Sequence, residues 1–213
     1  MSANPIFADL SSNNSEFQPV PYLQAGHIMV AIKATEGTGY VNPDHRPWCL
    51  AAGGHRMHVV HYHFGRPDLG NNALSEARHF LEVALPLCGG RDYLVLDLER
   101  ATPAGWQHDP TWSVRFDRYI REHSRFATIL YASRSTLQSV PGDWLDRPPL
   151  RVWDADWSLT PDMAPHGYEV AFRQFTDGVH GPGPHGLPGV GVCDVNQARG
   201  STWREILATS PHC

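Results

Sequence analysis

Two acidic side chains, Asp97 and Glu99, lie at and just beyond the end of a short apolar run. The run Leu-Val-Leu at 94–96 is typical of a buried strand, and a spacing of two residues puts both carboxylates on one face. Two adjacent carboxyl groups repel when ionised, so one keeps its proton to a higher pH and can act as a general acid. Glycoside hydrolysis needs such a pair, an acid for the leaving oxygen and a carboxylate for the developing cation. A solvated strand end, or an ion pair with Arg100, would explain the same residues.

His61 and His63 also share one strand face, with a spacing that suits metal ligands. A zinc site needs further ligands, and with 13 His in the chain a chance H-x-H pair is unsurprising. The cysteines are widely separated and form no C-x-x-C pair, so a zinc knuckle is not indicated. Their spacing neither assigns nor excludes a disulfide, and buried free thiols are the simpler expectation. The four are Cys49, Cys88, Cys193 and Cys213.

Composition limits the class of protein that must position these residues. The chain has 213 residues, 41% of them hydrophobic, which predicts one globular domain over 1–213 with a substantial core. The net charge of −5 argues against binding of duplex nucleic acid. No stretch approaches the roughly 18 apolar residues of a membrane span, so we expect no membrane insertion. The N-terminal residues lack a basic region and an apolar run, so we expect no signal peptide.

Strand-like and helix-like segments alternate along the chain. Pro110 suits the start of a helix over 110–123, and amphipathic spacing predicts a helix over 71–87. Weaker helices are expected at 44–52 and 202–207, and the Gly- and Pro-rich stretch 178–191 is expected to be a long surface loop. Alternation over the whole length predicts an α/β fold, either a parallel sheet or a βα barrel. The expected strands are 5–9, 27–33, 57–64, 93–99, 127–132, 150–155 and 169–175.

Function in a parallel α/β fold collects at the carboxyl ends of the strands. Carboxylates and aromatic residues recur at nearly all of these ends. Asp9 and Asp194 would also fit ordinary turns. Lys33, the only lysine among 17 Lys and Arg residues, falls at the end of the second expected strand.

Taken together and in order, these segments resemble the glycoside hydrolase family 25 lysozymes, the Chalaropsis type of muramidase. The resemblance covers the chain from near its start to about position 200. It is carried by Asp9-Leu10-Ser11-Ser12, Ile32-Lys33-Ala34-Thr35-Glu36-Gly37-Thr38, Tyr62-His63-Phe64, Leu96-Asp97-Leu98-Glu99, Ile129-Leu130-Tyr131, Trp153 with Ala155, Gln174-Phe175-Thr176 and Asp194-Val195-Asn196.

The resemblance implies an irregular, flattened TIM-like βα barrel with an acidic groove across the carboxyl ends of its strands. It implies that Glu99 is the general acid/base, and that Asp97 either steers the substrate's acetamido group or stabilises the cationic transition state. Asp9 and Asp194 would complete the acidic cluster. No metal and no other cofactor is implied. Residues implied to line or brace the groove are Tyr62, Lys33, Glu36, Tyr131, Trp153 and Gln174.

The implied substrate is bacterial peptidoglycan, cut at the β-1,4 bond between N-acetylmuramic acid and N-acetylglucosamine. A wall-cutting enzyme without a signal peptide fits a phage endolysin, which stays in the host cytoplasm until a holin releases it. We expect a monomer, with a possible separate wall-binding domain. Two alternatives stay open: a metal-dependent amidohydrolase using His61, His63 and an Asp, and a non-catalytic glycan-binding module.

Three positions depart from the family pattern. Asp154 stands where an apolar residue is usual, Trp157 where Tyr is usual, and Cys193 where an aliphatic residue is common. The four carboxylates are intact. These departures therefore bear on the shape of the sugar subsites, not on the reaction.

Overall fold

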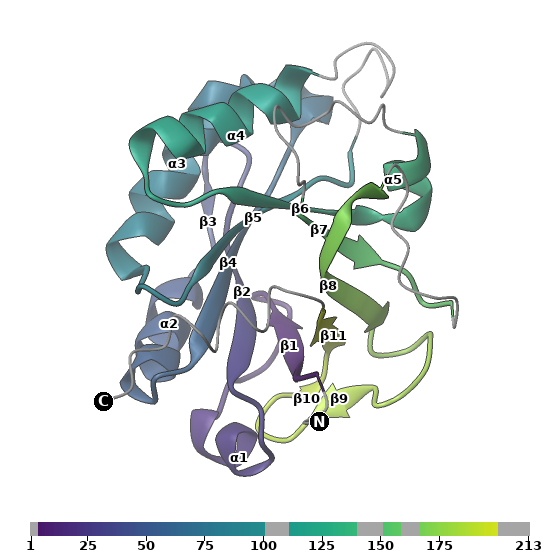
Figure 1. Cartoon of the computed structure of the whole chain (residues 1–213). Coiled ribbons are helices and arrows are strands. Elements are labelled where there is room, and N and C mark those ends of the chain that lie inside the picture. The colour runs from purple at the N-terminus through teal and green to yellow at the C-terminus, as the bar shows by residue number, and fades with distance from the viewer. Residues whose placement is uncertain (1–3, 101–110, 140–150, 159–166, 200–213) are drawn as a thin grey trace.

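The structure is a computed structural model, and it describes residues 4–100, 111–139, 151–158 and 167–199. Eight strands close into a barrel, in the order β1-β11-β8-β7-β6-β5-β4-β2 and back to β1 (Figure 1). The strands of the ring are β1 (Ile6–Leu10), β2 (Met29–Glu36), β4 (His58–Phe64), β5 (Tyr93–Asp97), β6 (Thr128–Ser133), β7 (Arg151–Ala155), β8 (Glu169–Thr176) and β11 (Asp194–Ala198).

Seven of these strands run parallel, and β11 runs antiparallel to both of its neighbours, β1 and β8. Outside the ring, β3 (Tyr40–Val41) pairs with the end of β2, while β9 (Gly186–Leu187) and β10 (Gly191–Val192) form a small hairpin. The barrel expected from the sequence is confirmed, and its seven expected strands all occur.

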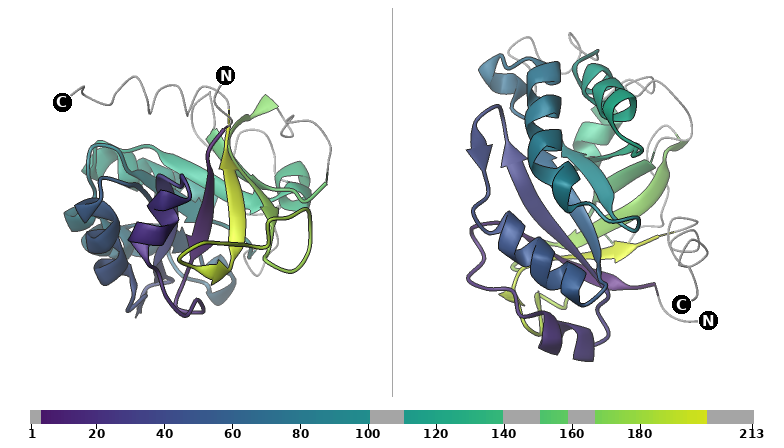
Figure 2. Two further views of the ribbon diagram at one scale, coloured as in Figure 1. Left: turned by 90° about the horizontal axis from the view of Figure 1, so that it is seen from below. Right: turned by 90° about the vertical axis from the view of Figure 1, so that its left-hand side faces the viewer.

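Helices cover the outside of the barrel, with α3 and α4 lying side by side and α2 below them (Figures 1 and 2). Asn72 caps α3 by accepting a hydrogen bond from the Leu74 N–H at 2.8 Å, so the helix begins at Ala73 instead of position 71. The helical elements are α1 (Pro19–Gln24), α2 (His45–Gly54), η1 (Pro67–Leu69), α3 (Ala73–Ala84), η2 (Leu85–Leu87), α4 (Thr111–His123) and α5 (Arg134–Ser139).

Alternate residues of the strands pack on opposite sides of the barrel wall, into one core cluster inside the barrel and two outside it. Inside the barrel, Phe7, Trp153 and Phe172 pack against each other with ring centroids 5.3–5.8 Å apart. Outside it, Leu94 and Leu96 of β5 meet the helices that cover the wall. The inner aromatic cluster fills the barrel, so a site built from the strands must lie at the barrel ends, as is usual for such barrels.

Two expectations need correction. The segment 194–198 was not expected as a strand because it is mostly polar, yet it forms β11, with Asn196 buried inside the barrel. The stretch 178–191 is not simply a surface loop, because it contains β9, and Leu187 and Val190 are buried in the core beside α1.

Some expectations fall outside the described residues, namely the helix at 202–207, Cys213 and the first residues of the segments at 110 and 150. Within the described ranges no helix is long and apolar enough to cross a bilayer.

Candidate active site

Four carboxylates gather at one end of the barrel. Asp9 lies near the end of β1, Asp97 ends β5, and Glu99 follows two residues later. Asp194 is the first residue of β11, and because β11 runs antiparallel, its start lies beside the carboxyl ends of the other strands. Asp9 and Asp194 are direct partners in the β1–β11 register. All four line one pocket of about 170 Å³.

A second, larger pocket of about 580 Å³ adjoins the acidic one. Glu99 and Tyr131 line both pockets, so together the two form a continuous groove with Glu99 at their junction. The larger pocket is lined on its far side by Trp157, whose indole is 41% exposed and stacks on His180. An extended ligand lying along the groove would therefore contact Glu99 between two binding regions.

Asp97 is a buried member of the cluster. Burial raises the pKa of Asp97 well above its ordinary value, and the charges of Glu99 and Asp9 raise it further, against an opposing effect of Lys33. Its Oδ1 atom accepts no hydrogen bond. Burial also raises the pKa of Glu99, while Arg100 and Lys33 lower it. Both carboxyls thus hold protons to a higher pH than free side chains do.

Asp9 and Asp194 behave in the same way. Burial raises the pKa of Asp9 well above its ordinary value, with Asp194 as the next cause. The pKa of Asp194 rises from 3.8 to about 6, through burial and then through the charges of Asp177 and Glu99. A site that holds so many carboxyls in low-dielectric surroundings costs stability whenever they ionise.

This cost predicts a pH dependence that Asp194→Asn removes. A folded-state pKa above the unfolded value means that the folded state binds more protons, so the stabilising contribution is present below pH 4 and is lost as the pH rises to about 6. We expect Asp194→Asn to be more stable than the wild type at pH 7 by on the order of 2 kcal/mol, and to match it near pH 4. Urea unfolding at several pH values measures this, and a stability difference that does not change with pH would contradict it.

Lys33 faces the acidic pocket, but its direct partner is not a groove carboxylate. Its Nζ atom lies 2.7 Å from Glu36 Oε2 and 4.8 Å from the ring centroid of Phe64. The other oxygen of Glu36 accepts a hydrogen bond from Arg66 Nη1 at 2.8 Å. Glu36 does not line the groove, and its role there is indirect, since it holds the Lys33 ammonium in place. The ammonium lowers the pKa values of Asp9, Asp97 and Glu99 through space.

A hydrogen-bonded chain runs across the floor of the groove. Tyr131 donates to Gln174 Oε1 at 3.0 Å, and Gln174 Nε2 donates to Asp194 Oδ2 at 3.1 Å. Trp153 is 1% exposed and donates to Asn196 Oδ1 at 2.9 Å. Trp153 is therefore an almost fully buried part of the pocket wall, while Tyr131 and Gln174 supply polar atoms. Tyr62 lines the same pocket and donates to the Leu10 carbonyl at 3.3 Å.

Sequence reasoning missed a charged network beside the larger pocket. Arg134, the first residue of α5, lies 2.5 Å from Asp154 Oδ2 and 2.9 Å from Asp156 Oδ2. Asp156 also accepts from Arg173 Nε through its carbonyl at 2.9 Å. This network explains Asp154, which departs from the family pattern but finds its counter-ion on α5. The sequence gives no local signal for this ion pair, because Arg134 and Asp154 are 20 residues apart.

His61 and His63 lie on the outer face of β4 and not among the residues that line the groove. His63 is buried between Thr35, at 2.8 Å, and Glu76 of α3, at 2.7 Å. His61 instead contacts His45 of α2 at 2.9 Å. The two histidines thus have separate partners, and the metal-dependent amidohydrolase built on this pair is not favoured. Cys49, Cys88 and Cys193 are free thiols, as expected.

A closed βα barrel with a groove of carboxylates at the carboxyl ends of its strands defines a barrel-type glycoside hydrolase. The sequence pattern of the glycosyl hydrolases family 25 matches residues 8–183. The chain belongs to this family, which confirms the resemblance seen in the motifs.

Relatives agree with this membership. The lysozyme of Streptococcus phage Cp-7 is 30% identical over 171 residues, or 78% of this chain and 47% of that protein. The chain thus spans about half the length of this curated relative. A family 25 glycosyl hydrolase from Bacillus anthracis has a TM-score of 0.79 at 19% identity, covering 96% of this chain and 93% of that one. A lysozyme from Streptomyces coelicolor has a TM-score of 0.78 at 23% identity, covering 97% of each chain.

Proposed function

We propose that this chain is a muramidase that hydrolyses the β-1,4 bond between N-acetylmuramic acid and N-acetylglucosamine in bacterial peptidoglycan. The observation that carries the proposal is the position of Glu99, at the junction of the acidic pocket and the larger pocket. Family membership and the lysozyme relatives support the same reaction.

Glu99 is the general acid/base in this proposal. Its raised pKa lets the carboxyl hold its proton to a higher pH than a free glutamate does, so it can donate this proton to the glycosidic oxygen as the bond to the anomeric carbon breaks. Water then adds to the anomeric carbon and returns a proton to Glu99. Asp97 either steers the acetamido group of the substrate or stabilises the cationic transition state.

The remaining groove residues hold the substrate. Lys33 is held by Glu36, and its positive charge makes the acidic pocket less negative than four carboxylates alone would make it. Tyr131 and Gln174 fix Asp194, and Trp157 offers an exposed aromatic face to a sugar ring.

We further propose that residues 1–213 act as one catalytic domain, that the chain is a monomer, and that it serves as a phage lysin. In that role it would await holin-mediated release in the host cytoplasm, and a separate wall-binding domain would be its natural companion. The phage lysozyme relative, which is about twice as long as the stretch matched here, supports this setting.

Mass spectrometry of the products from defined peptidoglycan tests the reaction. A muramidase leaves new reducing ends on N-acetylmuramic acid. Reducing ends on N-acetylglucosamine would instead indicate a glucosaminidase, and released peptides without reducing ends would indicate an amidase. Binding to peptidoglycan with no new reducing ends would favour the non-catalytic glycan-binding module.

A further inference from the structure

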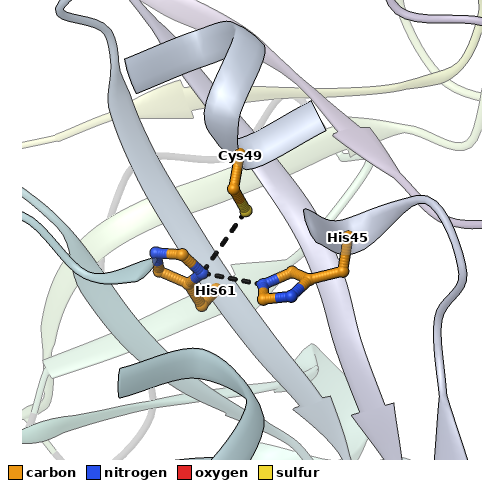
Figure 3. Close-up of side chains that lie close together, drawn as sticks. All are labelled: His45, Cys49 and His61. Atoms are coloured by element: carbon orange, nitrogen blue, oxygen red, sulfur yellow. Dashed lines mark hydrogen bonds between the residues drawn. The ribbon is translucent and has the colours of Figure 1, made fainter. Parts of the chain in front are cut away.

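Three metal-ligating side chains meet on the outer face of the barrel, between α2 and β4 (Figure 3). His45 and Cys49 lie four residues apart, so they stand one turn apart on the same face of α2. His61 reaches them from β4. All three are buried, and none lines the groove that holds the carboxylates.

The distances among the donor atoms fit a single ion. His45 Nε2 lies 2.9 Å from His61 Nδ1, and Cys49 Sγ lies 3.7 Å from the same nitrogen. Two nitrogens bound to one tetrahedral zinc are about 3.3 Å apart, and a nitrogen and a sulfur are about 3.6 Å apart, given the usual bond lengths. The two nitrogens would need to move apart by about 0.4 Å, the printed nitrogen–sulfur distance already fits, and all three donor atoms lie within 4.8 Å of one another.

We propose that His45 Nε2, Cys49 Sγ and His61 Nδ1 bind a zinc ion, with water in the fourth position. Two imidazoles and a thiolate form a ligand set that favours Zn²⁺ over the hard cations Mg²⁺ and Ca²⁺. The ion joins α2 to β4 and takes no part in the groove chemistry. The proposal is independent of the proposed hydrolytic function.

The far sides of the two imidazoles give independent support. Among the described residues, the buried atoms His45 Nδ1 and His61 Nε2 have no hydrogen-bond partner, and Asp92 Oδ2 lies 3.5 Å from His61 Nε2. When the near nitrogens bind an ion, the far nitrogens carry the ring protons, and the His61 Nε2–H then faces Asp92 Oδ2 at 3.5 Å. Asp92 is itself held by the backbone N–H of Val59 at 3.0 Å. A carboxylate behind a ligating histidine is a recurrent feature of zinc sites.

The site also has a route to solvent. A pocket of about 560 Å³ is lined by both Cys49 and Asp92, and it opens between the end of α2 and the segment that precedes β5. An ion and its water can enter by this pocket, and the thiol proton of Cys49 can leave by it. Burial raises the pKa of that thiol, so the thiolate is favoured only when a cation is bound.

Cobalt substitution on the full chain tests the ligand set. The chelator-treated protein is titrated with Co²⁺, and we expect a thiolate-to-cobalt charge-transfer band and tetrahedral d–d bands that saturate at one ion per chain. Zn²⁺ should abolish both. Cys49→Ala should remove the charge-transfer band, while the control Cys88→Ala, which changes a half-buried thiol outside the proposed ligand set, should keep it. A wild-type protein that binds Co²⁺ without the charge-transfer band would overturn the proposal.

Calorimetry and thermal unfolding provide a second measurement that does not depend on any one variant folding. Zn²⁺ should raise the unfolding temperature of the wild type, because it binds only the folded chain. We expect Asp92→Asn to weaken zinc binding about 10–100-fold, since it acts through His61, while the loss of a direct ligand in His45→Gln costs more. Equal zinc affinity in the wild type and both variants, or no binding to the wild type, would show that the cluster is only a hydrogen-bonded part of the core.

Discussion

Glu99→Gln is expected to lower the rate of peptidoglycan hydrolysis by about 10²–10⁴-fold, the usual contribution of a general acid/base. Glutamine keeps the size and hydrogen-bonding capacity of the side chain but has no proton to donate at the glycosidic oxygen. Glu99 is placed where the two pockets meet, so no other carboxyl of the cluster lines both regions. Release of reducing ends from purified cell walls measures the loss.

Glu82→Gln is the matched control, because Glu82 lies exposed on α3, away from the groove. It should hydrolyse peptidoglycan at the wild-type rate. Circular dichroism should show both variants folded, since Glu99 is at the surface of the groove and its charge is not needed for folding. Wild-type activity in a folded Glu99→Gln protein would exclude the proposed role.

Glu76→Ala is expected to have the largest effect on stability, a loss of about 3 kcal/mol. Glu76 is fully buried on α3, and its Oε2 atom accepts hydrogen bonds from His63 Nε2 at 2.7 Å and from the Arg66 N–H at 3.0 Å. Alanine would leave both donors buried without an acceptor. Burial lowers the pKa of His63 and Glu76 opposes this, so the loss of Glu76 further disfavours a charged ring.

Urea unfolding at pH 7 measures the effect of Glu76→Ala. Glu76→Gln retains one acceptor oxygen and should lose less stability, while Glu82→Ala on the exposed side of the same helix should change stability by less than about 0.5 kcal/mol. A Glu76→Ala protein as stable as the Glu82→Ala control would show that the His63–Glu76 contact contributes nothing.

The parts of the fold and site that could be predicted were those written into short, contiguous patterns. Leu94-Val95-Leu96 followed by Asp97 is apolar enough to mark a buried strand with an acid at its end, and parallel strands bring such ends together. The helix over α3 was visible from its apolar spacing, and only its ends moved, because the Asn72 side chain caps it.

The parts that could not be predicted depend on long-range pairing. Asn196 is a residue type typical of loops, so the sequence around it does not indicate the strand β11. Its side chain can be buried because the Trp153 indole donates a hydrogen bond to it. Arg134 and Asp154 come together only when α5 packs beside β7. The H-x-H pattern correctly indicated that His61 and His63 share one strand face. The residues that cluster with His61, however, are His45 and Cys49 of α2.

The pairing of β1 with β11 joins two segments that lie far apart in the described chain. Asp9 and Asp194 are partners in the β1–β11 register although 185 residues separate them in the chain. A nascent or truncated chain that stops before residue 194 has neither a closed ring nor the fourth carboxylate. Contacts of such high sequence separation form late, because a long loop must close first. The acidic cluster is therefore complete only after β11 has been synthesised and has paired with β1.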